Sequence, residues 1–201
     1  MLPIQKGNLL KEFSLSLEKL DITSQEIFSQ LFQQTHVQVY RYLSGLTGGL
    51  PEEIDDLVAE TFARAWSARY SFNGDFKAAL RWLLIIAKHQ MIDSYRRRKA
   101  AGEPVSLDTK DPPAPGIDPE SQALYDERRQ ILWNLLQSLP EEAREMLVLR
   151  YILDWSVGEI AAHLHKNETA VSMAIHRALK RLQRDWLIKD AVVDTRSELN
   201  V

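Results

Sequence analysis

The stretch SVGEIAAHLHKNETAVSMAIHRALKRL, residues 156–182, carries two amphipathic helical patterns separated by a few residues. Ser156 and Glu159 have the spacing of a capping box at the start of the first helix, and Asn167 is a suitable N-cap for the second. The second helix is expected to bury Val171, Ile175, Ala178, Leu179 and Leu182. This pattern predicts a helix-turn-helix, whose second helix enters the major groove of DNA. The alternative is an ordinary helical bundle whose lysines and arginines face solvent.

Two further helical patterns lie near the start of the chain. Residues 24–46 repeat apolar side chains at helical spacing behind a capping box formed by Thr23 and Glu26, and Gly48 is expected to end this helix. A second helix has Pro51 in its first turn, an unbroken i, i+3, i+4, i+7 apolar series and an acidic outer face. No segment shows the alternation typical of a strand, so the predicted fold class is all-α.

The segment WLLIIAKHQMIDSYRRRK, residues 82–99, predicts another helix, apolar at its start and strongly basic at its end. Asn73 and Gly74, within a cluster of aromatic residues, indicate a turn before it. The four cations at 96–99 either face a polyanionic partner or simply end the helix favourably, since cations suit a helix C-terminus.

Residues 101–124 are rich in Gly, Ser, Asp and Pro and show no periodicity. Long structureless segments are uncommon inside compact domains, which favours a flexible linker between two small helical domains. Helical patterning resumes at 125–137, and Ser138 and Glu141 form a third capping box. The predicted parts are an N-terminal extension (1–22), a first helical domain (23–100), a Pro-rich acidic linker (101–124), a second helical domain (125–187) and a C-terminal tail (188–201).

Charge is distributed unevenly along the chain. The formal net charge of -3 argues against strong binding to nucleic acid by the whole chain alone. Residues 88–99, however, hold five cations against one acid, whereas residues 101–125 hold five acids against one lysine. Basic patches are therefore present, separated by an acidic spacer.

Composition also restricts the chemistry. The chain has no cysteine, which excludes disulfides, thiolate catalysis and thiolate zinc sites. Its five histidines include no helical i, i+4 metal pair, because His163 and His165 lie two residues apart. No phosphate-binding Gly-rich loop or nucleophile with a base is evident, so we expect no enzyme, metal or cofactor. Without a long apolar run or a leader pattern, the chain is expected to be cytoplasmic.

Several segments share their spacing with motifs of one known family. In the first domain these are DDLVAETFARAW (55–66) and WLLIIAKHQMIDSYRRRK (82–99). In the second they are LPEEAREMLVLRYILDWSVGEIAAHL (139–164) and the V-x-x-x-x-H-R-A-x-K-R-L pattern that follows at 171–182. From about residue 24 to 186 the chain thus resembles the extracytoplasmic-function (ECF) sigma factors, with sigma region 2 followed by a linker and region 4. Two domains in this order, joined by a linker of fitting length and composition, make the combined resemblance specific.

The resemblance implies a transcription initiation factor that binds core RNA polymerase and directs promoter recognition and melting. Its polymerase-binding segment corresponds to Asp55, Asp56, Leu57 and Glu60. An acidic rim around an apolar centre complements an arginine-rich partner, although acidic helix faces are usually just solvated. Ala59 replaces a usual glutamine, so one polar contact is expected to be absent.

Region 2 of the family captures a flipped base of the minus-10 element and holds the nearby backbone with cations. The corresponding residues are Phe72, Asn73, Asp75, His89, Arg96, Arg97, Arg98 and Lys99. His89 stands where asparagine is common, which implies a different preferred base. The alternative for Phe72, Phe76 and Trp82 is a place in the hydrophobic core, and we favour it for Trp82.

Region 4 of the family reads the minus-35 element with its recognition helix. The corresponding residues are Ser172, Met173, His176 and Arg177 for the bases and Asn167, Thr169, Lys180 and Arg181 for the phosphates. Relatives often have cations at the positions of Ser172 and Ala174, so the duplex contact is expected to be weaker or shifted. His165 replaces a frequent turn glycine, and we expect a slightly rearranged turn.

The implied partners are core RNA polymerase, promoter DNA and an anti-sigma factor, with no membrane insertion and no small-molecule substrate. The acidic linker either occupies a cationic channel of the polymerase or acts as an entropic tether. The alternative function is that of a stand-alone helix-turn-helix regulator, which would bind a palindromic operator without polymerase.

Overall fold

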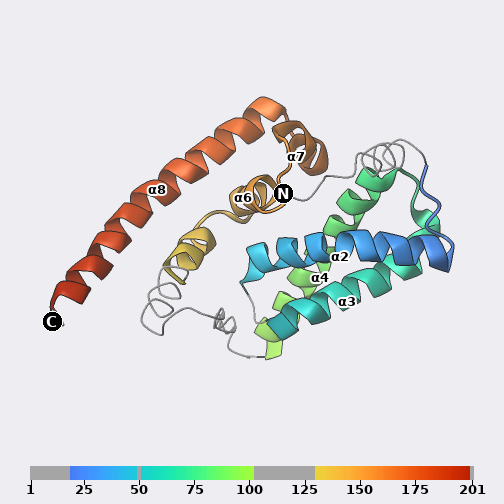
Figure 1. The fold of residues 1–201 in the computed structure, drawn as a ribbon, viewed down its shortest axis with the longest axis horizontal. Coiled ribbons are helices and arrows are strands. Elements are labelled where there is room, and N and C mark those ends of the chain that lie inside the picture. The colour runs from blue at the N-terminus through green and yellow to red at the C-terminus, as the bar shows by residue number, and fades with distance from the viewer. Residues whose placement is uncertain (1–18, 49–50, 102–129, 200–201) are drawn as a thin grey trace, which may run out of the picture. The chain divides into compact units, whose positions relative to one another are not determined.

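The computed structural model describes residues 19–48, 51–101 and 130–199, with the backbone alone at residue 51 and residues 188–199 (Figure 1). These residues contain helices and no strand, which confirms the all-α class. They divide into two compact units, described separately below. The predicted linker lies outside the described residues except at Ala101, and so does the N-terminal extension up to residue 18.

The first unit contains the helices α2 (Gln25–Thr47), α3 (Pro51–Ala68) and α4 (Phe76–Ala101), with a short 3-10 helix, η1 (Arg69–Ser71), before α4. Residues 44–48, at the end of α2, cluster instead with the second unit. As predicted, Gly48 ends α2: it takes a left-handed conformation (φ 57°), and its N–H donates to the Ser44 carbonyl (2.9 Å).

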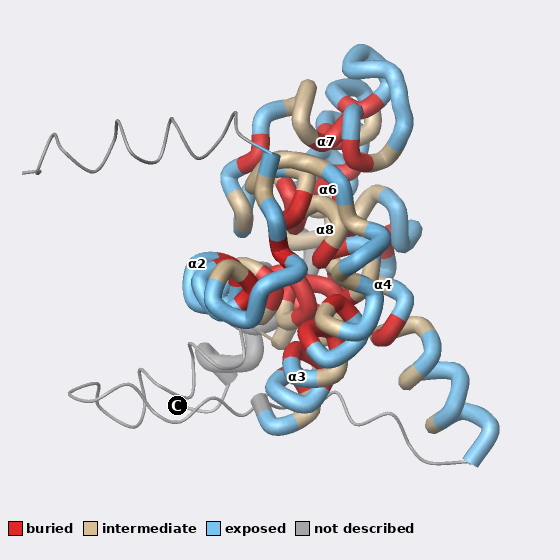
Figure 2. The backbone as a smooth tube through the Cα atoms, turned by 90° about the vertical axis from the view of Figure 1, so that its right-hand side faces the viewer, coloured by how far each residue is buried: buried red, intermediate tan, exposed pale blue. Residues whose placement is uncertain are grey.

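The core of the first unit is made by the inner faces of its three long helices. Phe28 of α2 meets Phe62 and Trp66 of α3 edge to face, with ring centroids 6.4 and 5.0 Å apart. From α4, Leu83 and Leu84 are fully buried. Figure 2 shows the same division along these helices, with buried segments inside and exposed segments outside.

The second unit contains a helical segment at residues 130–137 and the helices α6 (Glu141–Tyr151), α7 (Val157–Leu164) and α8 (Glu168–Leu199). The last three pack against one another in pairs. Of the stripe predicted for α8, Val171, Ile175 and Ala178 are buried, but Leu179 is 37% exposed and was wrongly placed. The α8 helix runs for 32 residues and includes residues 188–199, which the sequence had assigned to a tail.

One of the three predicted capping boxes is present. At α7 the Ser156 hydroxyl accepts from the Glu159 N–H (3.2 Å), and the Glu159 carboxylate accepts from the Ser156 N–H (3.0 Å). At α6 the box is absent: Pro140 precedes the helix without a side-chain cap, because the Ser138 hydroxyl donates to the Leu135 carbonyl (2.8 Å) instead.

The start of α2 also differs from the prediction. Ser24, rather than Thr23, caps the helix by accepting from the Ile27 N–H (3.2 Å). Thr23 instead donates to the Asp21 carboxylate through its hydroxyl (2.7 Å) and its N–H (3.1 Å). These two hydrogen bonds favour the ionised form and lower the pKa of Asp21.

Candidate functional site

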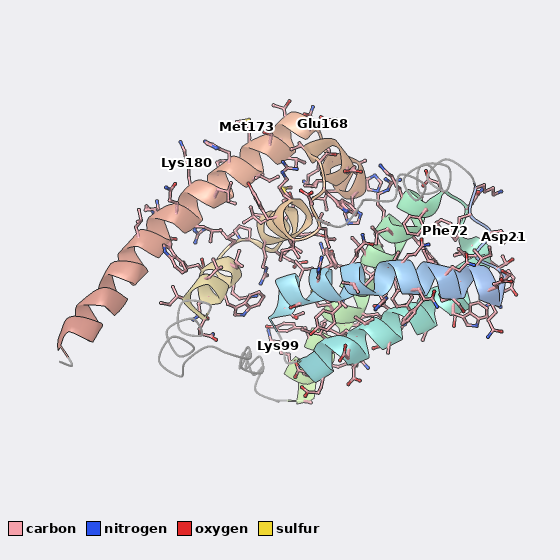
Figure 3. All side chains as sticks on the ribbon, in the orientation of Figure 1. Asp21, Phe72, Lys99, Glu168, Met173 and Lys180 are labelled. Atoms are coloured by element: carbon pink, nitrogen blue, oxygen red, sulfur yellow. The ribbon has the colours of Figure 1, made fainter. Side chains whose placement is uncertain are left out.

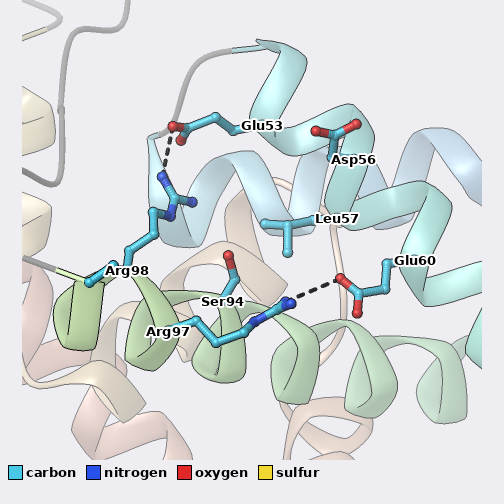
Figure 4. A pocket seen from close by; sticks show the side chains of 8 residues that line it. Glu53, Asp56, Leu57, Glu60, Ser94, Arg97 and Arg98 are labelled. Carbon is cyan, nitrogen blue, oxygen red and sulfur yellow. Dashed lines mark hydrogen bonds and ion pairs between the residues drawn. The ribbon is translucent and has the colours of Figure 1, made fainter. Parts of the chain in front are cut away.

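An open groove of about 470 Å³ lies between α3 and α4 in the first unit (Figure 4). It is lined by Glu53, Asp56, Leu57 and Glu60 from α3 and by Ser94, Arg97, Arg98 and Ala101 from α4. Three of the four predicted polymerase-binding residues therefore share one surface. Asp55 is exposed on α3 but does not line the groove, and Leu57 is only 5% exposed.

Two ion pairs cross this groove. Arg98 Nη1 lies 2.7 Å from Glu53 Oε1, and both side chains are about two-thirds buried. Arg97 Nη2 lies 3.5 Å from Glu60 Oε2, with both partners more exposed (Figure 4). From the sequence, Glu53 is one of the acids of the outer face of this helix, and its ion pair could not be predicted because the partner lies 45 residues away.

Glu60 has a second partner on α4. With its amide nitrogen turned toward Glu60, the buried Gln90 donates to Glu60 Oε1 (2.8 Å) and accepts from Arg64 Nε (2.9 Å). Glu60 is thus held by α4 from two positions, which fixes its carboxylate at the edge of the groove.

The structure divides the cations at the end of α4 into two sets. Arg97 and Arg98 turn toward α3 and its acids. Trp82, His89 and Arg96 follow one another at intervals of seven residues and so lie on another stripe of the helix. Lys99 extends this stripe by one turn and, like His89 and Arg96, is exposed (Figure 3). Arg96 also approaches Asp93, at 3.9 Å.

The loop before α4 contains the residues predicted to capture a base. The Phe72 ring lies 5.2 Å from the Trp82 ring and is half-buried against it. Asp75 Oδ1 accepts from the Ala78 N–H (2.7 Å), so this side chain caps α4. Asn73 is exposed between them. Asn73 therefore presents its side chain to a partner more fully than Phe72 or Asp75.

Sequence reasoning missed an aromatic and cationic cluster at η1. The Arg69 guanidinium lies over the rings of Trp66 (3.7 Å) and Tyr70 (4.2 Å) and donates to the Tyr70 hydroxyl (2.8 Å). It also donates to the Thr23 carbonyl (3.3 Å). Tyr70 is 72% exposed, close to the loop. The aromatic composition of 70–76 indicated a cluster, but not which ring would face solvent.

In the second unit, α7, a tight turn and α8 form the predicted helix-turn-helix. His165 ends α7 in the left-handed conformation (φ 53°, ψ 44°), and its N–H bonds to the Ala161 carbonyl. The turn therefore keeps the geometry that glycine favours, and is not rearranged around this residue. Asn167 Oδ1 then accepts from the Thr169 N–H (2.7 Å), so Asn167 caps α8 as predicted.

The outer face of α8 exposes the predicted base-reading and phosphate-binding side chains, while Val171 and Ile175 are buried on the inner face. The exposed residues are Thr169, Ser172, Met173, His176, Arg177, Lys180 and Arg181 (Figure 3). Arg181 Nε lies 3.7 Å from Asp185 Oδ2, one turn further on. Asn167 is also exposed, but its oxygen is engaged in the cap.

A buried polar pair joins α6 to α7. His163 Nε2 lies 3.8 Å from Glu145 Oε1, and their side chains are 3% and 1% exposed. The Trp155 ring meets His163 edge to face at 5.3 Å. Sequence reasoning weighed His163 only as a metal ligand. The structure instead places it inside the unit that carries the helix-turn-helix.

Two features are absent from the described residues. No group of three His, Asp or Glu side chains in the described part of the chain is arranged to hold a metal ion. Nor does any helix there combine the length and apolarity needed to cross a membrane.

Comparison with protein-family models assigns both units. Residues 31–101 match the model for Sigma-70 region 2, and residues 129–182 match the model for Sigma-70, region 4. Together the two matches span more than half of the chain. The chain belongs to the sigma-70 family. Region 2 and region 4 occur in the order that the sequence motifs indicated.

Curated relatives of this sigma-70 chain include ECF RNA polymerase sigma factors, which confirms the resemblance to that group. SigX of Bacillus subtilis (strain 168) is 26% identical over 175 residues, which cover 85% of this chain and 89% of the relative. SigL of Mycobacterium tuberculosis (strain ATCC 25618 / H37Rv) is 28% identical over 153 residues, which cover 76% and 85%.

Two solved structures are similar to the sigma-70 chain. CnrH, determined in complex with the cytosolic domain of CnrY, aligns with a TM-score of 0.57 and 28% identity over 84% of this chain and 90% of CnrH. The sigma factor RpoE from Bartonella quintana, determined with the anti-sigma factor NepR, aligns with a TM-score of 0.59 and 20% identity over 79% and 95%. The second likeness concerns the fold alone.

Proposed function

We propose that this chain is an ECF sigma factor that binds core RNA polymerase and directs it to promoters. The observation that carries the proposal is the pairing of two helical units, one matching sigma region 2 and the other matching region 4. Each unit also exposes charged side chains where the family resemblance puts its contacts. The protein acts by binding, without catalysis, and works in the cytoplasm where its polymerase is found.

Polymerase docking is assigned to the outer face of α3. Asp55 and Asp56 are exposed, and Glu60 lies at the edge of the groove. An acidic surface of this kind attracts a basic partner and guides its approach. Leu57 is almost fully buried. We therefore assign it to supporting this surface from beneath, with little direct contact with polymerase.

Contact with the minus-10 element is assigned to the loop before α4 and to the exposed stripe of that helix. Asn73 and His89 are exposed and able to hydrogen-bond an unpaired base. Phe72 supports the loop by packing on Trp82, and Asp75 holds its shape by capping α4. Arg96 and Lys99 are placed to meet backbone phosphates next to the opened strands.

Contact with the minus-35 element is assigned to the first turns of α8. Ser172, Met173, His176 and Arg177 face outward and are suited to base edges in the major groove. Lys180 and Arg181 continue the same exposed face and are suited to phosphates, as are Thr169 and the backbone around Asn167. Because Ser172 and Ala174 carry no charge, specificity here depends largely on His176 and Arg177.

An anti-sigma factor is a further proposed partner. Support comes from CnrH, which is 28% identical to this chain and was determined with the cytosolic domain of CnrY bound to it. A partner of this kind would block the chain by covering the acidic surface of α3 or the recognition face of α8.

Run-off transcription with purified core polymerase and a promoter library tests the main proposal. Transcripts that require the added protein are expected, and their start sites would define the promoter elements. If the protein gives no transcript and instead binds a palindromic operator tightly without polymerase, the chain is a stand-alone helix-turn-helix regulator and the proposal is wrong.

A further inference from the structure

Two surfaces with different proposed partners meet in the α3–α4 groove. Glu60 belongs to the proposed polymerase-binding surface, whereas Arg97 belongs to the cationic run 96–99 that the family resemblance puts near promoter DNA. In the free chain these two side chains form an ion pair across the groove, at 3.5 Å. Glu53 holds Arg98 in the same way, at 2.7 Å.

A guanidinium paired with a carboxylate has part of its charge neutralised, so its attraction to a phosphate is weaker until the ion pair opens. Opening costs most for Arg98, because its ion pair is short and two-thirds buried and is therefore screened less by water and salt. It costs less for Arg97, whose side chain is 67% exposed. Gln90 adds to the hold on the acidic side by donating to Glu60.

The other two cations of the run are not held in this way. Arg96 and Lys99 lie on the exposed stripe of α4, where Arg96 approaches Asp93 at 3.9 Å. Half of the cationic run is therefore available to DNA in the free chain, and the other half is neutralised by acids of α3.

We propose that these two ion pairs, Glu53–Arg98 and Glu60–Arg97, form a charge switch. In the free chain they withhold two arginines from DNA. When a cationic segment of core polymerase docks on α3, it takes over the two carboxylates and releases both arginines toward promoter phosphates. The inference rests on the proposed function, and it makes polymerase docking and promoter binding favour each other.

The switch is tested first without polymerase, with the full chain and a short labelled single-stranded DNA of mixed sequence. The double variant Glu53→Gln, Glu60→Gln removes both acids and keeps their shape. Its control is Glu26→Gln, Glu52→Gln, which removes the same charge from exposed positions that do not line the groove. Helical circular dichroism verifies that both variants are folded.

We expect the groove variant to bind the DNA about fivefold more tightly than its control. This is the change in affinity that corresponds to the free energy of two weak, partly exposed ion pairs. Its salt dependence is expected to steepen by roughly one unit of log–log slope as freed arginines displace counterions. In a background of Arg97→Gln, Arg98→Gln the gain is expected to disappear. Equal affinity of groove variant and control, or a gain that persists in that background, would overturn the charge switch.

A second arm repeats the measurement with core polymerase at saturating concentration. Because docking has already released the arginines, the advantage of the groove variant is expected to vanish in the complex. An advantage that stays the same with polymerase bound contradicts release by docking. Failure of the unmodified chain to bind polymerase or to support run-off transcription would instead contradict the proposed function, so the two failures can be told apart.

Discussion

His165 adopts a left-handed backbone conformation that is unfavourable for residues other than glycine. The sequence indicated that this position suits glycine, and the left-handed φ of 53° agrees with that expectation. What the sequence could not predict is whether the chain would rearrange or accept the strain. Packing of α7 and α8 against α6 decides the outcome, because moving the turn would disturb both helices.

We predict that His165→Gly stabilises the second unit. Glycine removes the steric cost of the left-handed conformation but loses more backbone entropy, so the net gain in unfolding free energy is expected to be about 1 kcal/mol. The measurement is urea denaturation followed by circular dichroism. As a control, His176→Gly makes the same change at an exposed helical position and is expected to destabilise by about 0.5 kcal/mol. A loss of stability in both variants would contradict the strain at His165.

Arg177 illustrates which contacts can be predicted from sequence. An exposed position on a recognition helix follows from periodicity alone, and the structure places Arg177 there. The tasks of Phe72 and Asp75 could not be predicted in this way, because they depend on Trp82 and on where α4 begins.

Substitution of Arg177→Gln is expected to lower run-off transcription from a promoter with a minus-35 element about tenfold, as expected for one base-edge contact. Arg184→Gln serves as the control, since Arg184 pairs with Asp185 and is not among the proposed DNA contacts. The comparison uses the same promoter and polymerase concentration. Similar activity of the two variants would remove Arg177 from the recognition surface.

At the scale of the element, the three capping boxes had the same sequence spacing and different outcomes. Ser156 and Glu159 form the box, whereas Ser138 turns back to the carbonyl of Leu135. The sequence could locate these helices well, but their first residues depend on how the preceding segment ends. The helix after Ser138 starts beyond Pro140, so the serine lies too early to cap it.

We expect Ser156→Ala to destabilise the second unit by about 1 kcal/mol, because α7 then loses the acceptor for its Glu159 N–H. The matched variant Ser138→Ala is expected to cost clearly less, since its hydroxyl donates to the Leu135 carbonyl and does not cap the start of α6. Both are compared by the midpoint of thermal unfolding. No measurable loss for Ser156→Ala would contradict a stabilising box at α7.

The contact between α6 and α7 depends on a pair that could not be read from the sequence. Glu145 and His163 are both polar residues at helical core positions, and their meeting inside the unit follows only from the packing of the two helices. A buried pair of this kind is costly to break, because the remaining partner stays buried without its counterpart.

Glu145→Met is therefore expected to lower the unfolding free energy of the second unit by about 2 kcal/mol, because His163 then stays buried without its polar partner. The combined Glu145→Met, His163→Leu variant is expected to recover most of this loss, since two apolar side chains then replace the pair. Denaturant unfolding of both variants at neutral pH measures the difference. If the combined variant is the less stable of the two, the pair does not work as described.

At the scale of the whole molecule, sequence motifs predicted the two units, their order and their family. Region 2 and region 4 were recognised from their motifs taken together, and both regions match their family models. The α3–α4 groove was not predictable, because its two walls come from helices whose paired residues lie about 40 positions apart. The extent of α8 was not predictable either. No helix breaker follows residue 187 to end the helix, but no clear apolar stripe continues beyond it to predict that the helix goes on.

Reversing charge on the exposed face of α3 tests polymerase docking by the full chain. Asp55→Lys with Asp56→Lys is expected to weaken binding to core polymerase at least about tenfold, because like charges then face each other. Glu26→Lys, an exposed acid on α2, is the control and is expected to change the affinity little. The affinities are measured by fluorescence anisotropy. If both variants weaken polymerase binding equally, the net charge of the chain explains the effect, and α3 is not a specific docking surface.

The length of α8 offers a practical consequence. Leu187 is exposed and lies 15 residues beyond Ser172 on the same helix, a separation of about 22 Å along the axis. Since the chain contains no cysteine, a Leu187→Cys variant accepts a single thiol-reactive dye. The dye is carried on the same helix as the base-reading turns but lies away from them. Energy transfer between this dye and a labelled duplex would therefore report when the recognition helix binds DNA.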